Sequence, residues 1–132
     1  MRKFIIYGCA ERGDANSAYL TRYYITDTSS GKPNLCLHIF HRSDADVMHD
    51  HPWNFWTIVL WRGYIEHTPN GQRRFWPGMI CKRMANHIHR VELINGKPAV
   101  TLCLMGPKLR SWGFWENGVF TKWREYFAKK GC

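Results

Sequence analysis

The sequence contains two pairs of histidines with a single residue between the members, and each pair could bind a metal ion. His49 and His51 lie in the stretch MHDHPW, and His87 and His89 lie in NHIHR. Side chains alternate along a β-strand, so histidines two positions apart point to the same face. Imidazole nitrogen is a common ligand of divalent transition metals. Two such pairs in one small chain indicate a metal site, although histidine is also an ordinary residue at a core edge or on a surface.

Asp50 lies between the first two histidines and should therefore point to the opposite face. We expect it to accept hydrogen bonds, at the surface or behind the ligands, rather than to bind the metal. The third ligand must then come from a distant part of the chain, and the second histidine pair offers it.

The elements that must position these residues are predicted to be short strands. The longest apolar and β-branched runs cover residues 19–27, 35–41, 55–67 and 98–106, and shorter ones follow the turn TPNGQ at 73–76, 77–83 and 89–93. Gly63 predicts a bulge or sharp bend inside the run 55–67.

Turn residues separate these runs every 8 to 12 positions or so, as in sandwiches and barrels, and TSSGKPN is the first such cluster. Only WREYFAKK, at 123–130, predicts a helical turn. The sequence shows no repeat or linker, so we expect one all-β domain over residues 1–132.

Composition predicts a globular, soluble protein. The chain has 132 residues, of which 45% are hydrophobic and 15% aromatic, far above the content of a disordered chain. No apolar run approaches the roughly 18 residues of a membrane helix, and the opening stretch does not resemble a secretory leader. We therefore expect a cytoplasmic, intracellular protein that does not bind membranes.

The five cysteines are odd in number and form no C-x-x-C pair, so the sequence suggests neither a disulfide framework nor a zinc finger. Three lie inside apolar runs and are expected to be small buried side chains. Cys132 ends the chain beside two lysines and is expected to be part of a frayed terminus.

The net charge of +9 favours anionic partners. Nucleic acid, nucleotides and acidic substrates all remain compatible with it. However, the basic pairs fall in separate segments, and no helical motif that reads DNA is present. Nucleic acid is thus a partner that the sequence permits but does not favour, and a small anionic or aromatic substrate is expected instead.

The spacing of these residues resembles the two motifs of the cupin superfamily of small jelly-roll barrels. The first motif runs histidine, any residue, histidine, three or four residues, glutamate, six residues, glycine. His49, His51 and Gly63 match it, whereas the glutamate position falls on Phe55 or Trp56, neither of which can bind a metal.

The second motif runs glycine, five residues, proline, any residue, glycine, two residues, histidine, three residues, asparagine. Gly78 and His89 match with the spacing kept, whereas Met84, Asn86 and Leu93 replace the other three motif residues. Asparagine tolerates the left-handed turn that glycine usually supplies.

This resemblance covers residues 35–106 and selects His89 rather than His87 as the third ligand. It implies a cupin-type jelly-roll barrel with little helix and a divalent metal held by His49, His51 and His89. The chain is also similar to small stand-alone cupins of bacteria and phages.

The missing glutamate is the main departure from the motif. Three neutral imidazoles leave the ion its full double charge, which favours anionic ligands. The arrangement is similar to that of the thiol dioxygenases of the family, in which three histidines hold iron. Iron is therefore the expected metal, with zinc, nickel, manganese and copper left open because imidazole suits all of them.

Aromatic and basic residues near the motifs are candidates for the pocket. Trp53 and Trp112 could stack on a planar substrate, and Arg110 could bind its carboxylate or phosphate, although each tryptophan could equally belong to the core or rim. Tyr64 and His87 are the candidate catalytic groups, and Tyr64 could instead simply pack.

Three functions fit these features. The first is a mononuclear iron dioxygenase acting on a small anionic or aromatic substrate. The second is a metal-dependent isomerase, epimerase or lyase in which His87, Tyr64 or Glu66 serves as acid or base. The third is a non-enzymatic cupin that binds a ligand or nucleic acid. The chain is compatible with a monomer or a homodimer, in which the apolar opening FIIY could be a pairing edge.

Overall fold

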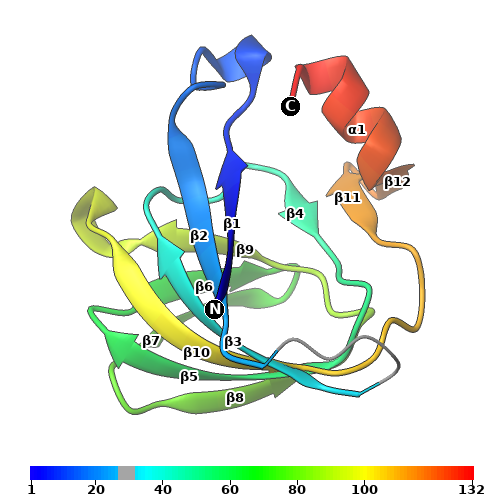
Figure 1. Ribbon diagram of the computed structural model, residues 1–132. Coiled ribbons are helices and arrows are strands. Elements are labelled where there is room, and N and C mark those ends of the chain that lie inside the picture. The colour runs from blue at the N-terminus through cyan, green and yellow to red at the C-terminus, as the bar shows by residue number, and fades with distance from the viewer. Residues whose placement is uncertain (27–31) are drawn as a thin grey trace.

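The computed structural model describes residues 1–26 and 32–132, and it shows two layers of antiparallel strands that enclose one core (Figure 1). The predicted turn TSSGKPN lies mostly outside the described residues. The larger layer is a six-stranded sheet in the order β1-β2-β3-β10-β5-β8. Its strands are β1 (Arg2–Tyr7), β2 (Ala18–Tyr24), β3 (Asn34–Phe40), β10 (Ala99–Met105), β5 (Phe55–Trp61) and β8 (Ile80–Arg83).

The opposite layer consists of two three-stranded sheets in the orders β7-β6-β9 and β12-β11-β4. A backbone bridge joins them, because the N–H of His49 donates to the carbonyl oxygen of His89 at 2.9 Å and the N–H of His89 donates back at 3.0 Å. The all-β jelly-roll fold is thus as predicted. The strands are β7 (Gly71–Phe75), β6 (Tyr64–Thr68), β9 (Arg90–Leu93), β12 (Val119–Lys122), β11 (Gly113–Glu116) and β4 (Met48–His49).

Alternation along the strands fills the space between the layers. On β5, Phe55, Thr57 and Val59 are buried, whereas Trp56 and Leu60 are exposed on the other face. Two groups of buried apolar side chains result, and Tyr64 stacks on Phe75 inside the first. The first group is Val59, Tyr64, Phe75, Val91, Leu93 and Ala99, and the second is Cys36, Phe55, Cys103 and Met105.

The predicted strand over 55–67 is interrupted and forms β5 and β6. Arg62 and Gly63 have φ values of 64° and 92°, which turn the chain from one layer to the other. A Cβ atom at Gly63 would collide with the carbonyl oxygen of Phe75. The motif glycine is therefore required both by its backbone angle and by the close approach of β7.

Several elements were not predicted from the sequence. These are β1, β4, β11, β12 and two 3-10 turns at Ala10–Arg12 and Ile94–Gly96, although the opening FIIY, named as a pairing edge, does lie in edge strand β1. The predicted helix is α1 (Trp123–Lys130), which packs against β11, β12 and the first 3-10 turn. None of the described helices is long and apolar enough to cross a membrane.

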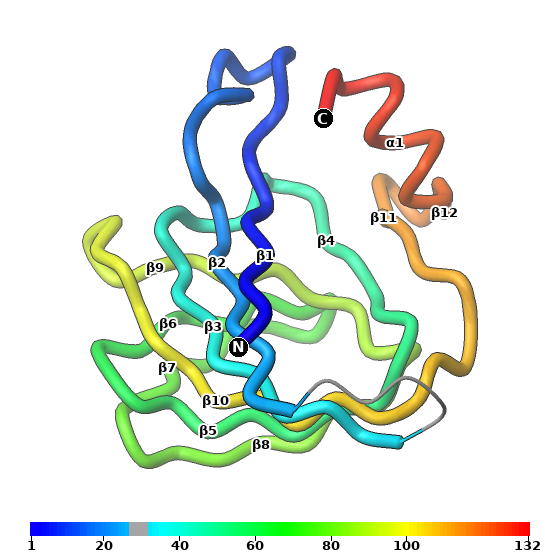
Figure 2. The backbone as a smooth tube through the Cα atoms, viewed as in Figure 1, coloured from blue at the N-terminus to red at the C-terminus, as the bar shows by residue number. Residues whose placement is uncertain are grey.

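The prediction that Cys132 belongs to a frayed terminus is wrong, because Cys132 forms a disulfide with Cys9. The carboxyl end of α1 returns to the turn after β1 (Figure 2), where the N–H of Ala10 donates to the carbonyl oxygen of Gly131 at 2.9 Å. The two cysteines are 123 positions apart, so only the fold reveals the pair. Of the other cysteines, Cys36 and Cys103 are buried as predicted.

Candidate metal centre

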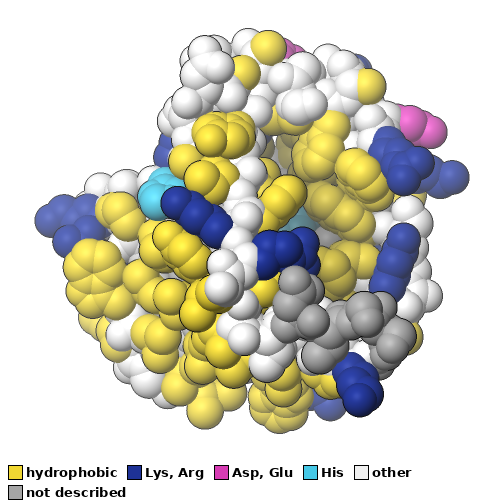
Figure 3. Space-filling view, in the orientation of Figure 1, with side chains coloured by type: hydrophobic (Ala, Val, Ile, Leu, Met, Phe, Trp, Pro, Cys, Tyr) yellow, Lys and Arg dark blue, Asp and Glu magenta, His cyan; other side chains and the backbone are white. Residues whose placement is uncertain are grey.

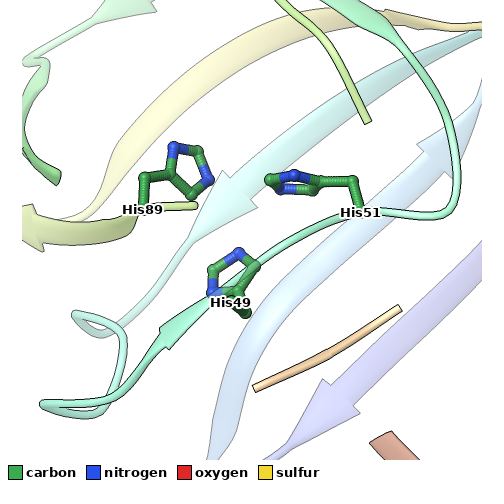
Figure 4. Close-up of side chains that lie close together, drawn as sticks. All are labelled: His49, His51 and His89. Atoms are coloured by element: carbon green, nitrogen blue, oxygen red, sulfur yellow. The ribbon is translucent and has the colours of Figure 1, made fainter. Parts of the chain in front are cut away.

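Two segments distant in sequence bring three histidines around one space (Figure 4). His49 is the last residue of β4, and His89 immediately precedes β9. The bridge between them places both side chains on the same face of the layer, and alternation adds His51 from the same segment. The ring centroids are 4.8 to 5.0 Å apart, and the candidate ligand nitrogens lie within 4.8 Å of one another.

Burial keeps these imidazoles neutral, which is the form that binds metals. It places the pKa of His49 and of His51 well below the ordinary value. The closeness of the other histidines acts in the same direction, because two protonated rings would repel each other. The pKa of His89 is also lowered by burial, against the opposing effect of Glu66. Among the described residues, Nδ1 of His51 is the buried side-chain polar atom that has no hydrogen-bond partner. This donor set therefore fits a divalent metal ion, whose identity it leaves open.

Two carboxylates lie behind the imidazoles. Nδ1 of His89 is hydrogen-bonded to Oε2 of Glu66 at 2.6 Å, and Nδ1 of His49 is 3.8 Å from Oδ2 of Asp44. The contact of His89 is a hydrogen bond of the kind that metal-binding histidines commonly make through their second ring N–H, and it fixes the tautomer and the direction of the ring. The distance of 3.8 Å between His49 and Asp44 is too long for a hydrogen bond. The bond on Nδ1 of His89 leaves its Nε2 free to bind a metal.

The two carboxylates differ in charge. Burial raises the pKa of Asp44 to about 7, against the hydrogen bond from the N–H of Val91. Burial acts in the same direction on Glu66, but hydrogen bonds from His87, His89 and Arg83 outweigh it and hold the pKa of Glu66 well below its usual range. Glu66 is therefore ionised, and the guanidinium of Arg83 balances it through contacts of 2.6 and 3.0 Å.

Glu66, His87 and His89 form a second group with the spacing of metal ligands, and it shares His89 with the first. Both oxygens of Glu66 already accept hydrogen bonds from Arg83, whose positive charge would repel a cation. We therefore favour the three-histidine group as the metal centre and assign Glu66 to the support of His89.

The two predicted catalytic residues lie in different surroundings. His87 lines a cavity of about 350 Å³, together with Glu66, Arg73 and Arg83, and its Nε2 is 3.2 Å from Oε2 of Glu66. Tyr64 is 6% exposed and belongs to the core, where burial raises the pKa of its phenol. A catalytic role for either residue remains a prediction.

Aromatic side chains surround the histidines. The ring of Trp112 is 6.3 Å from that of His49 and stacks on Trp123 at an interplanar angle of 8°. The ring centroid of Phe55 lies 4.7 Å from that of His51. Phe55 occupies one of the two positions at which the first cupin motif has its glutamate. Trp53 packs against the second apolar group rather than directly on the three rings. Of the two tryptophans proposed to bind substrate, Trp112 is thus the one that the structure brings next to a histidine.

Asp50 points away from the three histidines, as alternation predicted, and is 1% exposed. It accepts hydrogen bonds from the N–H of Gly113 at 2.8 Å and from Nε1 of Trp115 at 3.1 Å. Nη1 of Arg110 lies 2.8 Å from its Oδ2. Arg110, which was predicted to bind an anionic substrate, thus already pairs with a carboxylate of the protein, and the pair joins the segment before β11 to the segment after β4.

Sequence reasoning missed Arg22, which points into the space between the layers from β2. Its Nε donates to Nε2 of His38 at 2.9 Å, and its guanidinium carbon is 5.7 Å from the ring centroid of Trp53. Burial and the charge of Arg22 lower the pKa of His38 to about 3, so His38 is a neutral acceptor. No described acidic side chain pairs with Arg22. An arginine at an inward position of the alternating run YLTRYY is the sequence feature that could have indicated it.

Solved structures with the same arrangement of strands are cupins. A cupin-2 domain protein of Rhodospirillum rubrum matches 75% of this chain and 67% of its own, with a TM-score of 0.62 and 9% identity. An RmlC-like cupin of Ralstonia eutropha JMP134 matches 96% of this chain and 79% of its own, with a TM-score of 0.59 and 7% identity. The chain has a cupin fold. KdgF from Halomonas sp. is a further cupin-fold neighbour, covering 69% of this chain and 82% of its own, with a TM-score of 0.56 and 16% identity.

These similarities establish the fold and leave the activity open. No protein-family model and no curated protein matches the sequence. Other solved structures that share the cupin fold include DMSP lyases and the polyketide cyclase RemF of Streptomyces resistomycificus.

The support of His89 by Glu66 predicts how substitutions change metal affinity. Glu66→Gln should weaken Zn²⁺ or Co²⁺ binding by about 10- to 100-fold, because the amide orients His89 less strongly, whereas His89→Ala should remove a ligand and abolish tight binding. Competition with a chelator measures the affinity, and circular dichroism verifies that each variant is folded.

Glu92→Gln is the matched control, because Glu92 also hydrogen-bonds a histidine, His67, at 2.7 Å but lies away from the three rings. Equal affinities for Glu66→Gln, Glu92→Gln and the unmodified protein would refute the role assigned to Glu66.

Proposed function

We propose that the protein is a mononuclear metal enzyme that uses dioxygen to oxidise a small anionic or aromatic substrate. His49, His51 and His89 would hold the ion, with iron as the first candidate and zinc, nickel, manganese or copper as alternatives. The observation that carries this proposal is the convergence of three neutral imidazoles, one buried and two half-buried, with no carboxylate among them.

The absence of an acidic ligand in this group has a chemical consequence. A divalent ion would keep its full charge, which strengthens its attraction for an anionic substrate in a buried site. When bound, the metal would supply Lewis acidity and, if it is iron, redox chemistry with dioxygen. The protein supplies the fixed rings, the carboxylate of Glu66 that supports His89, and the exclusion of water by aromatic side chains.

The residues around the centre can be given roles in this proposal. Trp112 and Phe55 border the histidines and offer flat apolar surfaces to a substrate. His87 connects the cavity at β6 and β7 with Glu66, so it could carry a proton between solvent and the site. Trp53 and Tyr64 lie in the packed interior and would shape the site rather than react.

Arg22 is a better candidate than Arg110 for binding the anionic group of the substrate. Arg110 is neutralised by the buried Asp50, whereas Arg22 is held by the neutral His38 and faces the interior. A guanidinium without a carboxylate partner retains its capacity for a charge-assisted, bidentate bond. The substrate would therefore lie between Arg22 and the histidines.

A second candidate function is Lewis-acid catalysis by an isomerase, epimerase or lyase. The occurrence of lyases and a cyclase among the cupin-fold neighbours supports this alternative. His87 or Glu66 would then act as the acid or base.

The third candidate function is a non-enzymatic cupin that senses a ligand or nucleic acid. It has the weakest support of the three, because the basic residues are scattered over the surface. A cytoplasmic location belongs to this proposal as well, and in a reducing compartment Cys9 and Cys132 would be thiols.

Oxygen uptake distinguishes these functions. The protein is first loaded with Fe²⁺ under anaerobic conditions and then mixed with dioxygen and a panel of small anionic thiols and hydroxylated aromatic acids. It should consume dioxygen in the presence of at least one of these compounds. The zinc-loaded protein and His49→Ala should consume none above background, because the first lacks a redox-active metal and the second lacks a ligand. An oxygen electrode and product analysis by mass spectrometry measure the result.

Substrate conversion that proceeds equally well without oxygen, or with zinc, would favour the isomerase or lyase. Protein that retains no metal after exposure to Fe²⁺, Zn²⁺ or Co²⁺ would contradict both enzymatic functions.

The role of Arg22 predicts a change in anion affinity. In the Co²⁺-loaded protein, azide should bind at the metal and change the visible spectrum, and Arg22→Gln should weaken this binding by about tenfold through the loss of a nearby positive charge. Arg74→Gln is the matched control, since Arg74 also stacks on a tryptophan, Trp76, but on the outer side of the molecule. Identical azide affinities in the two variants would exclude Arg22 from the anion site.

A further inference from the structure

The outward side of the six-stranded sheet is apolar over four adjacent strands. Alternation that buries one set of side chains exposes the other set, and here the exposed set is hydrophobic too. We call this surface the outer apolar face, and it comprises Leu35, Leu37, Ile39, Trp56, Ile58, Leu60, Ile80, Val100, Leu102 and Leu104.

The register of the strands aligns these side chains into continuous rows. Leu104 lies between Leu35 on β3 and Trp56 on β5, both directly opposite it. In the next row, Leu102 lies between Leu37 and Ile58. Directly opposite side chains on one face of a sheet touch one another, so the rows merge into a single surface.

This surface carries almost no charge, although the chain has a net charge of +9. The outward positions of β3, β10 and β5 that form it are all apolar. Lys82 lies at the edge on β8, and its ammonium group is placed 5.5 Å from the ring centroid of Trp56. The charges of the protein thus lie at the rim of the face or elsewhere.

No described element covers the face. Helix α1 packs against β11, β12 and the first 3-10 turn, at the other end of the molecule. In the space-filling view, hydrophobic side chains dominate the side of the molecule formed by β5, β8 and β10 (Figure 3). The exposed fractions are 62% for Ile80, 48% for Trp56, 46% for Leu60 and 41% for Leu104.

The exposed area of the face is that of a large apolar surface patch. An aromatic side chain has about 150–250 Å² to bury and an aliphatic one about 100 Å², so these four side chains alone leave on the order of 250 Å² of apolar surface exposed. The half-buried members of the rows add to it. The face is thus in the range of the largest apolar patch of a typical monomer, about 300–600 Å², and such patches are often functional. A standard interface covers about 800 Å² on each partner, so the residues at the rim of the face would have to contribute to a dimer.

We propose that the outer apolar face is the interface of a homodimer, in which two copies stack sheet against sheet about a twofold axis. A second copy is the occupant that matches the face, because an uncharged apolar surface complements itself and homodimer interfaces are more apolar than transient ones. A nucleic acid or an acidic protein would need basic residues at the centre of the face, and there are none. The histidines lie on the opposite side of this sheet, so dimer formation and metal binding are separable properties.

The test is the molar mass in solution, measured by light scattering coupled to size exclusion and by sedimentation at 1 to 100 µM. The unmodified protein should have twice the mass of the chain. Leu104→Lys should be monomeric at the same concentrations, with at least a hundredfold weaker association, because each dimer would bury two lysine charges in an apolar interface. Ile80→Lys tests the same face at its most exposed position.

Val119→Lys is the matched control, because Val119 is 64% exposed but belongs to β12 in the other layer. It should remain dimeric, and circular dichroism should show that all variants are folded. An unmodified protein that is monomeric at 100 µM would overturn the proposal. So would a dimer that persists in folded Leu104→Lys and Ile80→Lys, since it would have to form elsewhere, for example through the edge strand β1.

Discussion

The reciprocal backbone hydrogen bonds between His49 and His89 are the constraint on which the site depends. They join the two small sheets into one layer. Because the bridged residues are themselves histidines, the same bonds also place two imidazoles side by side. Since β4 has only two residues, this bridge and its pairing with β11 fix most of its position. Asp50 reinforces that pairing from the opposite side by accepting hydrogen bonds from β11. The layer and the candidate metal centre are therefore built by the same contacts.

The three candidate ligands of the site are neutral, whereas the carboxylate of Glu66 that supports one of them is charged. Burial keeps the three imidazoles unprotonated, while the charge of Glu66 is retained because Arg83 and two histidines stabilise it. The net result is a cluster of nitrogen donors with a balanced ion pair behind it. Such an arrangement would leave the charge of a metal ion available to a substrate. Arg22 on β2, which donates to the neutral His38 and pairs with no described acidic side chain, would add to the attraction for anions.

The sequence allowed much of this arrangement to be predicted, because strand alternation and motif spacing are local properties. The strands around Gly63, the α-helix and the group of His49, His51 and His89 all follow from such patterns. The support of His89 by Glu66 and the disulfide between Cys9 and Cys132 depend instead on contacts between distant segments. The pairing of Arg110 with Asp50 was not predicted either, because the spacing of residues in a sequence does not indicate which carboxylate a guanidinium contacts in the fold.

Anomalous diffraction from a crystal of the metal-loaded protein tests the central claim most directly. The account predicts a single peak at the absorption edge of the metal, bounded by the imidazole nitrogens of His49, His51 and His89, with Glu66 in contact with His89 and not with the ion. A peak centred instead on Glu66 and His87, or no peak near any of these histidines, would contradict it.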